Sequence, residues 1–330
     1  MAEHSLDAPQ VLCFGEALID RLGPPGGDPA VDRPVDDRLG GAPANVACAL
    51  AHLGTPVAFL GRLGDDSSGA AFQRLFTDRG VDQRGVQLDP THSTRTVLVR
   101  RTAAGERVFQ GFAGDQGVGF ADQAVESRPW RDLLPSLTSA ARWLLIGTIP
   151  QASPASAAAL HTLLEWAADQ GIPVALDVNW RPTFWDATAD PASGPTASAL
   201  KAIRELLERA SLIKLAREEA LWFFQTDDPA SVSQALPQRP DVVVTDGAEP
   251  VRCCVEGGVF TLPVLAPPEV VDTTGAGDAF TAGLLHRWNR PVTERLRFAA
   301  ACGALVCGGA GAIDPQPNEI QVETFLGGIS

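Results

Sequence analysis

Residues 270–285 read Val-Val-Asp-Thr-Thr-Gly-Ala-Gly-Asp-Ala-Phe-Thr-Ala-Gly-Leu-Leu. Two β-branched residues, Val270 and Val271, lead into a turn of small residues, and the apolar residues that follow have helical spacing. The order predicts a strand end, a glycine loop and the start of a helix. The loop Gly275-Ala276-Gly277 lets a ligand approach the backbone, and N–H groups at a helix N-terminus attract an anion.

Asp278, directly after this loop, is unusual beside an anion site, because a site built only to hold phosphate would not place a carboxylate against it. The carboxylate makes sense if it takes a proton from a hydroxyl that attacks phosphorus. The alternative is an ordinary acid in the first turn of a helix, which gains about 0.3–1 kcal/mol from the helix dipole. This stretch alone leaves both interpretations open.

A second glycine pair, Gly40-Gly41, precedes an apolar run whose residues recur at i, i+3, i+4 and i+7, the spacing of one helix face. Pro43 suits the first turn of that helix, Asn45 lies one turn in, and Gly54 suits its end. The chain therefore has two glycine loops at helix starts, which favours a ligand site over two unrelated turns.

The chain as a whole alternates between β and α patterns, which predicts a parallel sheet with crossover helices on both faces. The predicted strands are 11–15, 56–60, 143–147, 174–178, 212–215 and 242–245, and further predicted helices are 70–79, 153–169 and 199–210. Asp20 is expected where the first strand runs out. Ligands of such sheets bind beyond the carboxyl ends of the strands. Four polar motifs fall there and share one rim: 177–181, 214–219, 245–247 and 270–285.

Residues 94–113 change to a β pattern, with strands 96–101 and 107–112 flanking a turn at 103–106. The hairpin is locally basic within an acidic chain because it carries Arg95, Arg100, Arg101 and Arg107. One interpretation is a charged edge that resists aggregation, and the other is a lid over an anionic ligand. A homodimer that pairs through the exposed edge of the hairpin is a further hypothesis.

The composition narrows the classes of function that the chain can have. The chain has 330 residues with 45% hydrophobic and 20% charged content, as an ordinary folded protein does. A net charge of −14 argues against a nucleic-acid or anionic-membrane partner, because such surfaces need clustered Lys and Arg. No apolar run reaches about 18 residues, and Met1–Gln10 lacks the pattern of a secretory signal. Six cysteines without metal-ligand spacing predict buried thiols in a reducing cytoplasm.

Two motifs, Gly40–Asn45 and Asp272–Asp278, resemble the two signatures of the ribokinase-like (PfkB) carbohydrate kinases. The order of the intervening pieces also matches, so the resemblance covers nearly the whole chain. Within that family the chain is most similar to the fructokinases, on the residues Gly15-Glu16, Asp20, Asp177–Pro182 and Phe184-Trp185.

The resemblance implies a single α/β carbohydrate kinase domain over residues 1–330. Its fold would be a ribokinase-like three-layer sandwich with a mostly parallel central sheet. A small β lid would come from segments of approximately 20–39 and 94–113.

The resemblance also implies a role for each matching residue. Asp278 matches the catalytic base, which takes the proton from a primary hydroxyl of the sugar, and Gly275-Ala276-Gly277 matches the anion hole for the transferring phosphoryl group. The residues expected to bind the sugar are Asp20, Gly40, Gly41, Asn45, Arg181 and Asp278. The residues expected to bind the nucleotide are Lys214, Thr245, Gly247, Gly275 and Gly277.

The implied reaction transfers the γ-phosphoryl group of ATP to D-fructose, giving fructose 6-phosphate, with Mg²⁺ bridging the phosphates. Glu219 matches an acidic position linked to Mg²⁺, and Asp272 with Thr274 matches residues that bind a monovalent cation such as K⁺. The chain departs from the family at Ala216, where an amide is usual, and at Pro250, where glycine is frequent. These departures bear on metal and nucleotide contacts and leave the base untouched.

Other functions stay open at this point. A kinase of the same family that acts on 2-keto-3-deoxygluconate, ribose or a nucleoside would differ only in the sugar pocket. A non-catalytic sugar-binding regulator would keep the fold and lose the base, whereas Asp278 is present. A nicotinamide dehydrogenase is disfavoured, because the first strand ends in Gly15-Glu16 and not in GxGxxG followed by an acid about 20 residues on.

Overall fold

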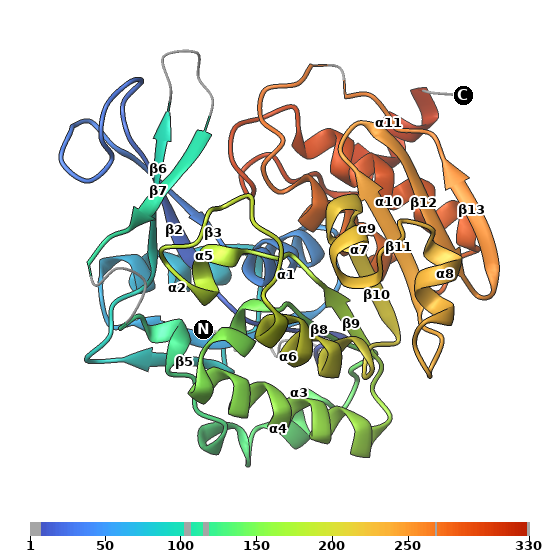
Figure 1. The fold of residues 1–330 in the computed structure, drawn as a ribbon, viewed down its shortest axis with the longest axis horizontal. Helices are drawn as coiled ribbons and strands as arrows, with labels where there is room; N and C mark the ends of the chain where they lie inside the picture. The colour runs from blue at the N-terminus through green and yellow to red at the C-terminus, as the bar shows by residue number, and fades with distance from the viewer. Residues whose placement is uncertain (1–7, 102–106, 115–118, 268, 329–330) are drawn as a thin grey trace, which may run out of the picture.

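The computed structural model describes residues 8–101, 107–114, 119–267 and 269–328 (Figure 1). Its centre is a nine-stranded sheet in the order β13-β12-β11-β10-β9-β8-β1-β4-β5. The strands from β5 across to β11 pair in parallel, and β12 and β13 add an antiparallel edge. The bounds are β1 (Val11–Phe14), β4 (Val57–Gly64), β5 (Val86–Asp89), β8 (Trp143–Ile146), β9 (Val174–Asp177), β10 (Leu212–Ala216), β11 (Asp241–Asp246), β12 (Glu249–Val255) and β13 (Gly258–Leu262).

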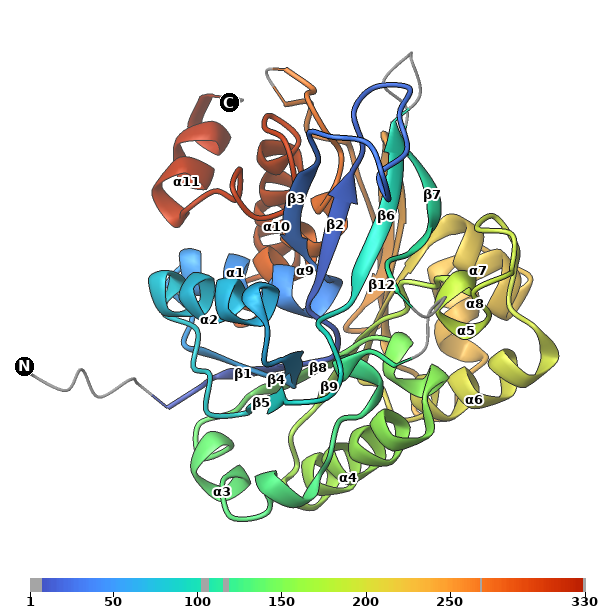
Figure 2. The same cartoon turned by 90° about the vertical axis from the view of Figure 1, so that its left-hand side faces the viewer.

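Two layers of helices cover the two faces of this sheet (Figure 2). One layer holds α1 (Ala42–His52), α2 (Ser67–Arg79), α9 (Ala276–His286), α10 (Val292–Val306) and α11 (Glu319–Gly328). The other holds α3 (Leu134–Leu137), α4 (Pro154–Gln170), α6 (Ala197–Leu207), α7 (Arg217–Phe224) and α8 (Pro229–Gln234). Neighbouring residues of a strand point to opposite faces, so Cys13 packs in the core of the first layer and Phe14 in that of the second. The predicted three-layer α/β sandwich with a mostly parallel sheet is confirmed.

A second, smaller sheet stands over the carboxyl ends of the central strands (Figures 1 and 2). Its order is β3 (Asp36–Gly40), β2 (Leu18–Leu22), β6 (Thr96–Arg101) and β7 (Arg107–Phe112). The two hairpin strands are as predicted, and the predicted turn at 103–106 lies outside the described residues. The expectation that Asp20 follows the end of a strand is wrong, because Asp20 lies inside β2, opposite Arg38 of β3 and Val97 of β6.

The basic hairpin suggested either a charged edge or a lid over an anionic ligand. Arg95, just before β6, has a different role from both. Its side chain is buried, and its Nε donates a hydrogen bond of 2.8 Å to Asp122. The guanidinium carbon lies 4.7 Å from the ring centres of Phe120 and Phe184 and 5.1 Å from that of Phe112. Arg95 therefore joins the small sheet to the body of the protein through an ion pair and cation–π contacts.

The prediction of a strand end at Val270-Val271 is wrong. Both side chains are more than half exposed and the backbone there is irregular, although the N–H of Val271 donates to the carbonyl of Cys307. The physical reason lies in β12 and β13, which form an antiparallel hairpin at the sheet edge. The chain leaves the sheet after Leu262 and reaches the glycine loop through irregular backbone.

Five of the six cysteines are buried, as predicted, and Cys254 is partly exposed. Among the described residues, no helix combines the length and the apolar character that crossing a lipid bilayer requires. The assignment of residues 1–330 to a single domain stays a prediction.

Candidate active site

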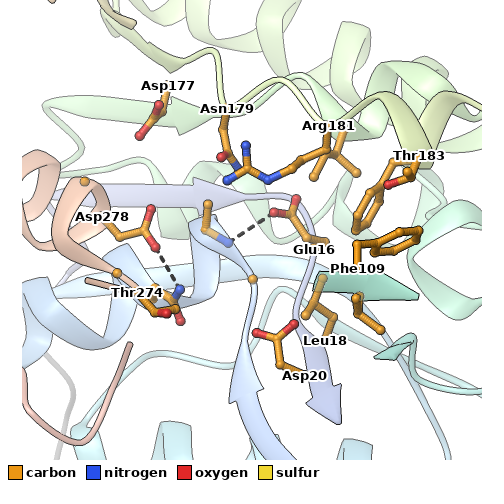
Figure 3. Close-up of a pocket in the computed structure, with 18 of the residues that line it drawn as sticks. Glu16, Leu18, Asp20, Phe109, Asp177, Asn179, Arg181, Thr183, Thr274 and Asp278 are labelled. Atoms are coloured by element: carbon orange, nitrogen blue, oxygen red, sulfur yellow. Dashed lines mark hydrogen bonds between the residues drawn. The ribbon is translucent and has the colours of Figure 1, made fainter. Parts of the chain in front are cut away.

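A cavity of about 540 Å³ opens at the carboxyl ends of the central strands, beneath the small sheet (Figure 3). Strands β1 and β8 are neighbours in the sheet, yet the chain passes through β4 and β5, on the other side of β1, before it reaches β8. Such a reversal of strand order is where open α/β sheets bind ligands. The cavity therefore lies where the topology favours a ligand site.

The structure brings most of the predicted site residues together around this cavity. Those that line it are Asp20, Gly41, Asn45, Arg181, Lys214, Glu219, Thr274, Gly275, Gly277 and Asp278. Gly40, Asp272 and Ala276 do not line it but each lies within two residues of one that does. Thr245 and Gly247, at the end of β11, also lie outside its lining.

Asp278 lies in the first turn of α9 and points into the cavity (Figure 3). Its Oδ2 accepts a hydrogen bond of 2.8 Å from Nδ2 of Asn45 on α1. Burial raises the pKa of Asp278 to about 6, the charge of Asp177 adds to the rise, and Asn45 and Lys214 oppose it. A carboxyl group with this pKa is ionised at neutral pH and still basic enough to assist proton removal from a hydroxyl.

The glycine loop forms the N-terminus of α9. Gly275 is the N-cap residue with φ of 81°, and a Cβ there would lie 2.6 Å from Cβ of Ala312, so only glycine fits without a shift. The N–H of Ala276 donates to the carbonyl of Thr273 at 3.2 Å. The N–H of Gly277 belongs to the first helical turn, whose donors have no acceptor within a helix. This end of α9 can therefore bind an anion.

Lys214, in the middle of β10, lies opposite Asp177 at the end of β9 and contacts it. Its Nζ lies 2.8 and 3.1 Å from the two carboxylate oxygens, and Thr281 of α9 also donates to Asp177 at 3.3 Å. Burial alone would lower the pKa of Lys214, but the neighbouring carboxylates outweigh it and the pKa is raised. A Cβ on Gly277 would come within 2.9 Å of Nζ, so the ammonium group lies directly beneath the glycine loop.

Glu219, on α7, is held by two backbone donors. Its Oε2 accepts from the N–H of Ala216 at 2.8 Å, and its Oε1 accepts from the N–H of Trp180 at 2.6 Å. Burial raises the pKa of Glu219 in spite of these bonds. The observed contacts make Glu219 a cap of α7 that also anchors the segment before Arg181, and its predicted contact with Mg²⁺ stays a prediction.

Asp20, Gly41 and Arg181 also line the cavity, and Figure 3 draws Arg181 above Glu16 and Asp20 below it. Gly41 has φ of 101°, and a Cβ there would lie 2.6 Å from the carbonyl oxygen of Glu16. The guanidinium of Arg181 donates to the carbonyl of Trp180 and extends toward the cavity. An acid and a guanidinium across a polar cavity suit a ligand rich in hydroxyl groups, which both donate and accept hydrogen bonds.

Three of the predicted nucleotide and monovalent-cation residues, Thr245, Asp272 and Thr274, make hydrogen bonds within the protein. The hydroxyl of Thr245 donates to the carbonyl of Leu215 at 3.4 Å, which ties the end of β11 to β10. Asp272 accepts from the N–H and hydroxyl of Thr274 and from the N–H of Gly311, and so closes the turn before the glycine loop. Binding of nucleotide or cation by these residues stays a prediction.

The sequence placed Asp177 and Asn179 at the rim without a specific role. The lining residues that received no specific role are Glu16, Leu18, Phe109, Asp177, Asn179 and Thr183. Two of them carried a usable signal, because Glu16 and Asp177 are carboxylates that directly follow or end a buried strand. Leu18 and Phe109 carried none, since an apolar residue of a strand is far more often part of a core.

Comparisons with known proteins agree with this geometry. The chain matches the model of the pfkB family carbohydrate kinases over residues 8–319. It is 33% identical over 337 residues to the probable fructokinase-6, chloroplastic, of Arabidopsis thaliana, covering 97% of this chain and 83% of that protein. The fructokinase from Xylella fastidiosa with bound ATP superposes with a TM-score of 0.80 at 29% identity, covering 97% of this chain and 98% of that one.

A second solved structure is the fructokinase from Vibrio cholerae O395 in its fructose, ADP and calcium ion bound form. It superposes with a TM-score of 0.80 at 28% identity, covering 97% of this chain and 99% of that one. The family match spans almost the whole chain, and both solved structures share the fold of this chain over nearly their full lengths. The chain belongs to the pfkB family of carbohydrate kinases.

Proposed function

We propose that this chain is a fructokinase, which transfers the γ-phosphoryl group of ATP to the 6-hydroxyl of D-fructose. The observation that carries the proposal is the position of Asp278, a carboxylate beside the N-terminus of α9 and at the edge of a polar cavity. The names and ligands of the similar proteins support fructose as the acceptor and ATP as the donor. A carboxylate at an anion site is explained by proton removal from an attacking hydroxyl.

The proposed reaction is an in-line displacement. Asp278 accepts the proton of the sugar hydroxyl, the hydroxyl oxygen forms a bond to the γ-phosphorus, and the bond from that phosphorus to the β–γ bridging oxygen breaks, releasing ADP. Asn45 orients the carboxylate through its hydrogen bond. The N–H of Gly277 and the positive end of the α9 dipole stabilise the charge on the transferring group.

The nucleotide would bind as MgATP, with Glu219 as the predicted protein ligand of the ion. The described residues contain no group of three or more His, Cys, Asp or Glu side chains arranged to hold a metal ion. Mg²⁺ is commonly bound by substrate phosphates, water and one or two carboxylates, so this arrangement fits a phosphate-bound ion. When bound, the ion neutralises phosphate charge. Direct contact with Glu219, and a K⁺ ion at Asp272 and Thr274, are part of the proposal.

An assay of ADP release over a panel of acceptors tests the function. With MgATP we expect the highest kcat/KM for D-fructose among fructose, ribose, 2-keto-3-deoxygluconate and nucleosides. A higher value for another acceptor would assign the chain to a sister kinase. ADP release with none of them, combined with measurable sugar binding, would support the non-catalytic regulator.

The pH dependence of turnover tests the role of Asp278. The base acts only when ionised, and its pKa is about 6. We therefore expect kcat for fructose to be independent of pH above about 7 and to fall about tenfold per unit below pH 6. Kinetics at saturating substrates measures this, with circular dichroism at each pH to exclude unfolding. A kcat that stays constant through pH 6 would contradict the assignment.

A homodimer through the small sheet stays a prediction. Strands β3 and β7 form the outer edges of that sheet, and Val108 of β7 is 47% exposed. An open strand edge can pair with a second copy. Light scattering after size exclusion is expected to give the mass of two chains, and a single-chain mass at every concentration tested would count against pairing.

A further inference from the structure

Glu16 lies on the segment between β1 and β2, and its carboxyl group lines the cavity (Figure 3). The residue is only 2% exposed. Its Oε1 accepts a hydrogen bond of 3.1 Å from the N–H of Ala42, the first residue of α1. The N-cap residue Gly41 has no side chain to cap this helix, so Glu16 serves as a cap from outside it.

The cap accounts for one oxygen of Glu16 and not for the other. Its Oε2 is buried and has no hydrogen-bond partner among the described residues. Buried polar atoms without a partner are rare, and each one requires an explanation. A second cavity that adjoins Glu16 has only about 10 Å³, which is too small for anything larger than a water molecule. Glu16 also lines the main cavity, which is large enough to hold a sugar.

Burial raises the pKa of Glu16 to about 8, interactions with the backbone N–H groups of Glu16 itself and of Ala42 oppose the rise, and the charge of Asp122 adds to it. The side chain is therefore a neutral carboxylic acid at pH 7, with Oε1 as the acceptor for Ala42 and an O–H group on Oε2. Asp20, across the same cavity, can only accept hydrogen bonds when ionised. A sugar hydroxyl that donates to Asp20 keeps lone pairs that can accept from a donor such as Glu16.

We propose that Glu16 is a ligand of the sugar, with Oε2 donating a hydrogen bond to an oxygen of the bound ketohexose, and that it thereby helps to select the acceptor. This inference rests on the proposed function for the identity of the sugar. It adds a neutral donor to the acceptor Asp20 and the cation Arg181, which line the same cavity.

Charged groups on several elements act on Glu16 or line the same cavity, so its ionisation depends on more than its own segment. They are Asp20 on β2, Asp122 beside Arg95, Asp177 on β9, Arg181 after β9, Lys214 on β10, Glu219 on α7 and Asp278 on α9. Most of them are acidic, and Asp122 and Asp278 both oppose ionisation of Glu16. The bound sugar is therefore expected to meet the neutral form at physiological pH.

Two substitutions of Glu16 distinguish a role as a sugar ligand from a role as a helix cap alone. Glu16→Gln keeps an acceptor for Ala42 and places an N–H donor where the O–H was, so the dissociation constant for fructose is expected to stay within about threefold of wild type. Glu16→Leu removes both groups, and the dissociation constant and the KM for fructose are expected to rise about 5- to 100-fold. The KM for ATP is expected to change less than twofold in both variants.

Asp82→Asn is the matched control, because Asp82 is a buried carboxylate that pairs with Arg84 outside the cavity. Calorimetry with fructose and steady-state kinetics measure the effects, and thermal unfolding confirms that each variant is folded. Wild-type fructose affinity in Glu16→Leu would overturn the proposal, as would equal weakening of fructose and ATP. A glutamine variant as weak as the leucine variant would overturn the donor assignment.

The pH dependence provides a readout that a cap alone would not change. As Glu16 ionises above about pH 8, the KM for fructose is expected to rise in wild type and to stay flat in Glu16→Gln. A rise of equal size in both would overturn the proposal. If the acceptor panel identifies another sugar, the same variants are measured with that sugar, so failure of fructose as the acceptor is distinguished from failure of Glu16 as a ligand.

Discussion

Replacing Asp278 with asparagine is expected to lower kcat by about 10²–10⁴-fold, because general-base catalysis contributes an effect of this size. The amide has nearly the same shape, and its oxygen can still accept the hydrogen bond from Asn45. The cavity and the glycine loop should therefore keep their geometry. Steady-state kinetics measures kcat. Calorimetry with a non-hydrolysable ATP analogue is expected to show nucleotide affinity within about threefold of wild type.

Glu294→Gln is the matched control for this experiment. Glu294 also lies in the first turn of a helix, α10, but it is exposed and outside the cavity. The control removes an acid with the same favourable position relative to a helix dipole, which is worth about 0.3–1 kcal/mol. Its kcat is expected to match wild type. Near-normal turnover in Asp278→Asn would show that Asp278 is only a first-turn acid and would refute its role as base.

Gly275→Ala is expected to lower kcat by about 10²–10³-fold, the effect of losing one donor to the transition state. The new Cβ would lie 2.6 and 2.7 Å from Cβ and Cα of Ala312, so the loop has to move. The residue would also hold a φ of 81°, which side chains rarely adopt. A displacement of about 1 Å is enough to remove the N–H groups from the phosphoryl group.

Gly171→Ala is the control that separates the effect of backbone strain from the effect of loop displacement. Gly171 is the C-cap of α4, has φ of 66°, and a Cβ there meets no atom within 4 Å. Its substitution is expected to cost about 1–2 kcal/mol of stability and to leave kcat unchanged. Thermal unfolding and steady-state kinetics on both variants make the comparison. If Gly275→Ala lost stability alone and kept its kcat, the glycine loop would have no part in phosphoryl transfer.

The sequence predicted the parts of the site that are continuous in the chain. The glycine loops before α1 and α9 are recognisable because a tight backbone turn at a helix start restricts the residues that fit, as the contacts of Gly41 and Gly275 show. The rim was predictable because parallel strands end at one edge of a sheet. Asp177 lies at such an end, where it contacts Lys214 of the neighbouring strand β10.

Long-range pairing limited the rest of the prediction. The hydrogen bonds of Glu219 with Trp180, and of Asn45 with Asp278, join residues 39 and 233 positions apart, and no local pattern encodes them. The small sheet was missed in part, because β2 and β3 are short strands whose pairing partners, and not their own residues, define them. The antiparallel hairpin of β12 and β13 at the sheet edge broke the expected alternation in the same way.

The cluster around Arg95 restricts how substrates reach the cavity. Three aromatic rings and Asp122 contact this side chain where β6 begins. Rotation of the small sheet as a rigid body would have to break these contacts. Phe184, one of the three rings, also lines the cavity, so the contacts of Arg95 include a residue of the cavity wall. We therefore expect the entrance to open by bending of β6 and β7 beyond Arg95. The stiffness of two strands, and not the breaking of an ion pair, would govern how often the entrance opens.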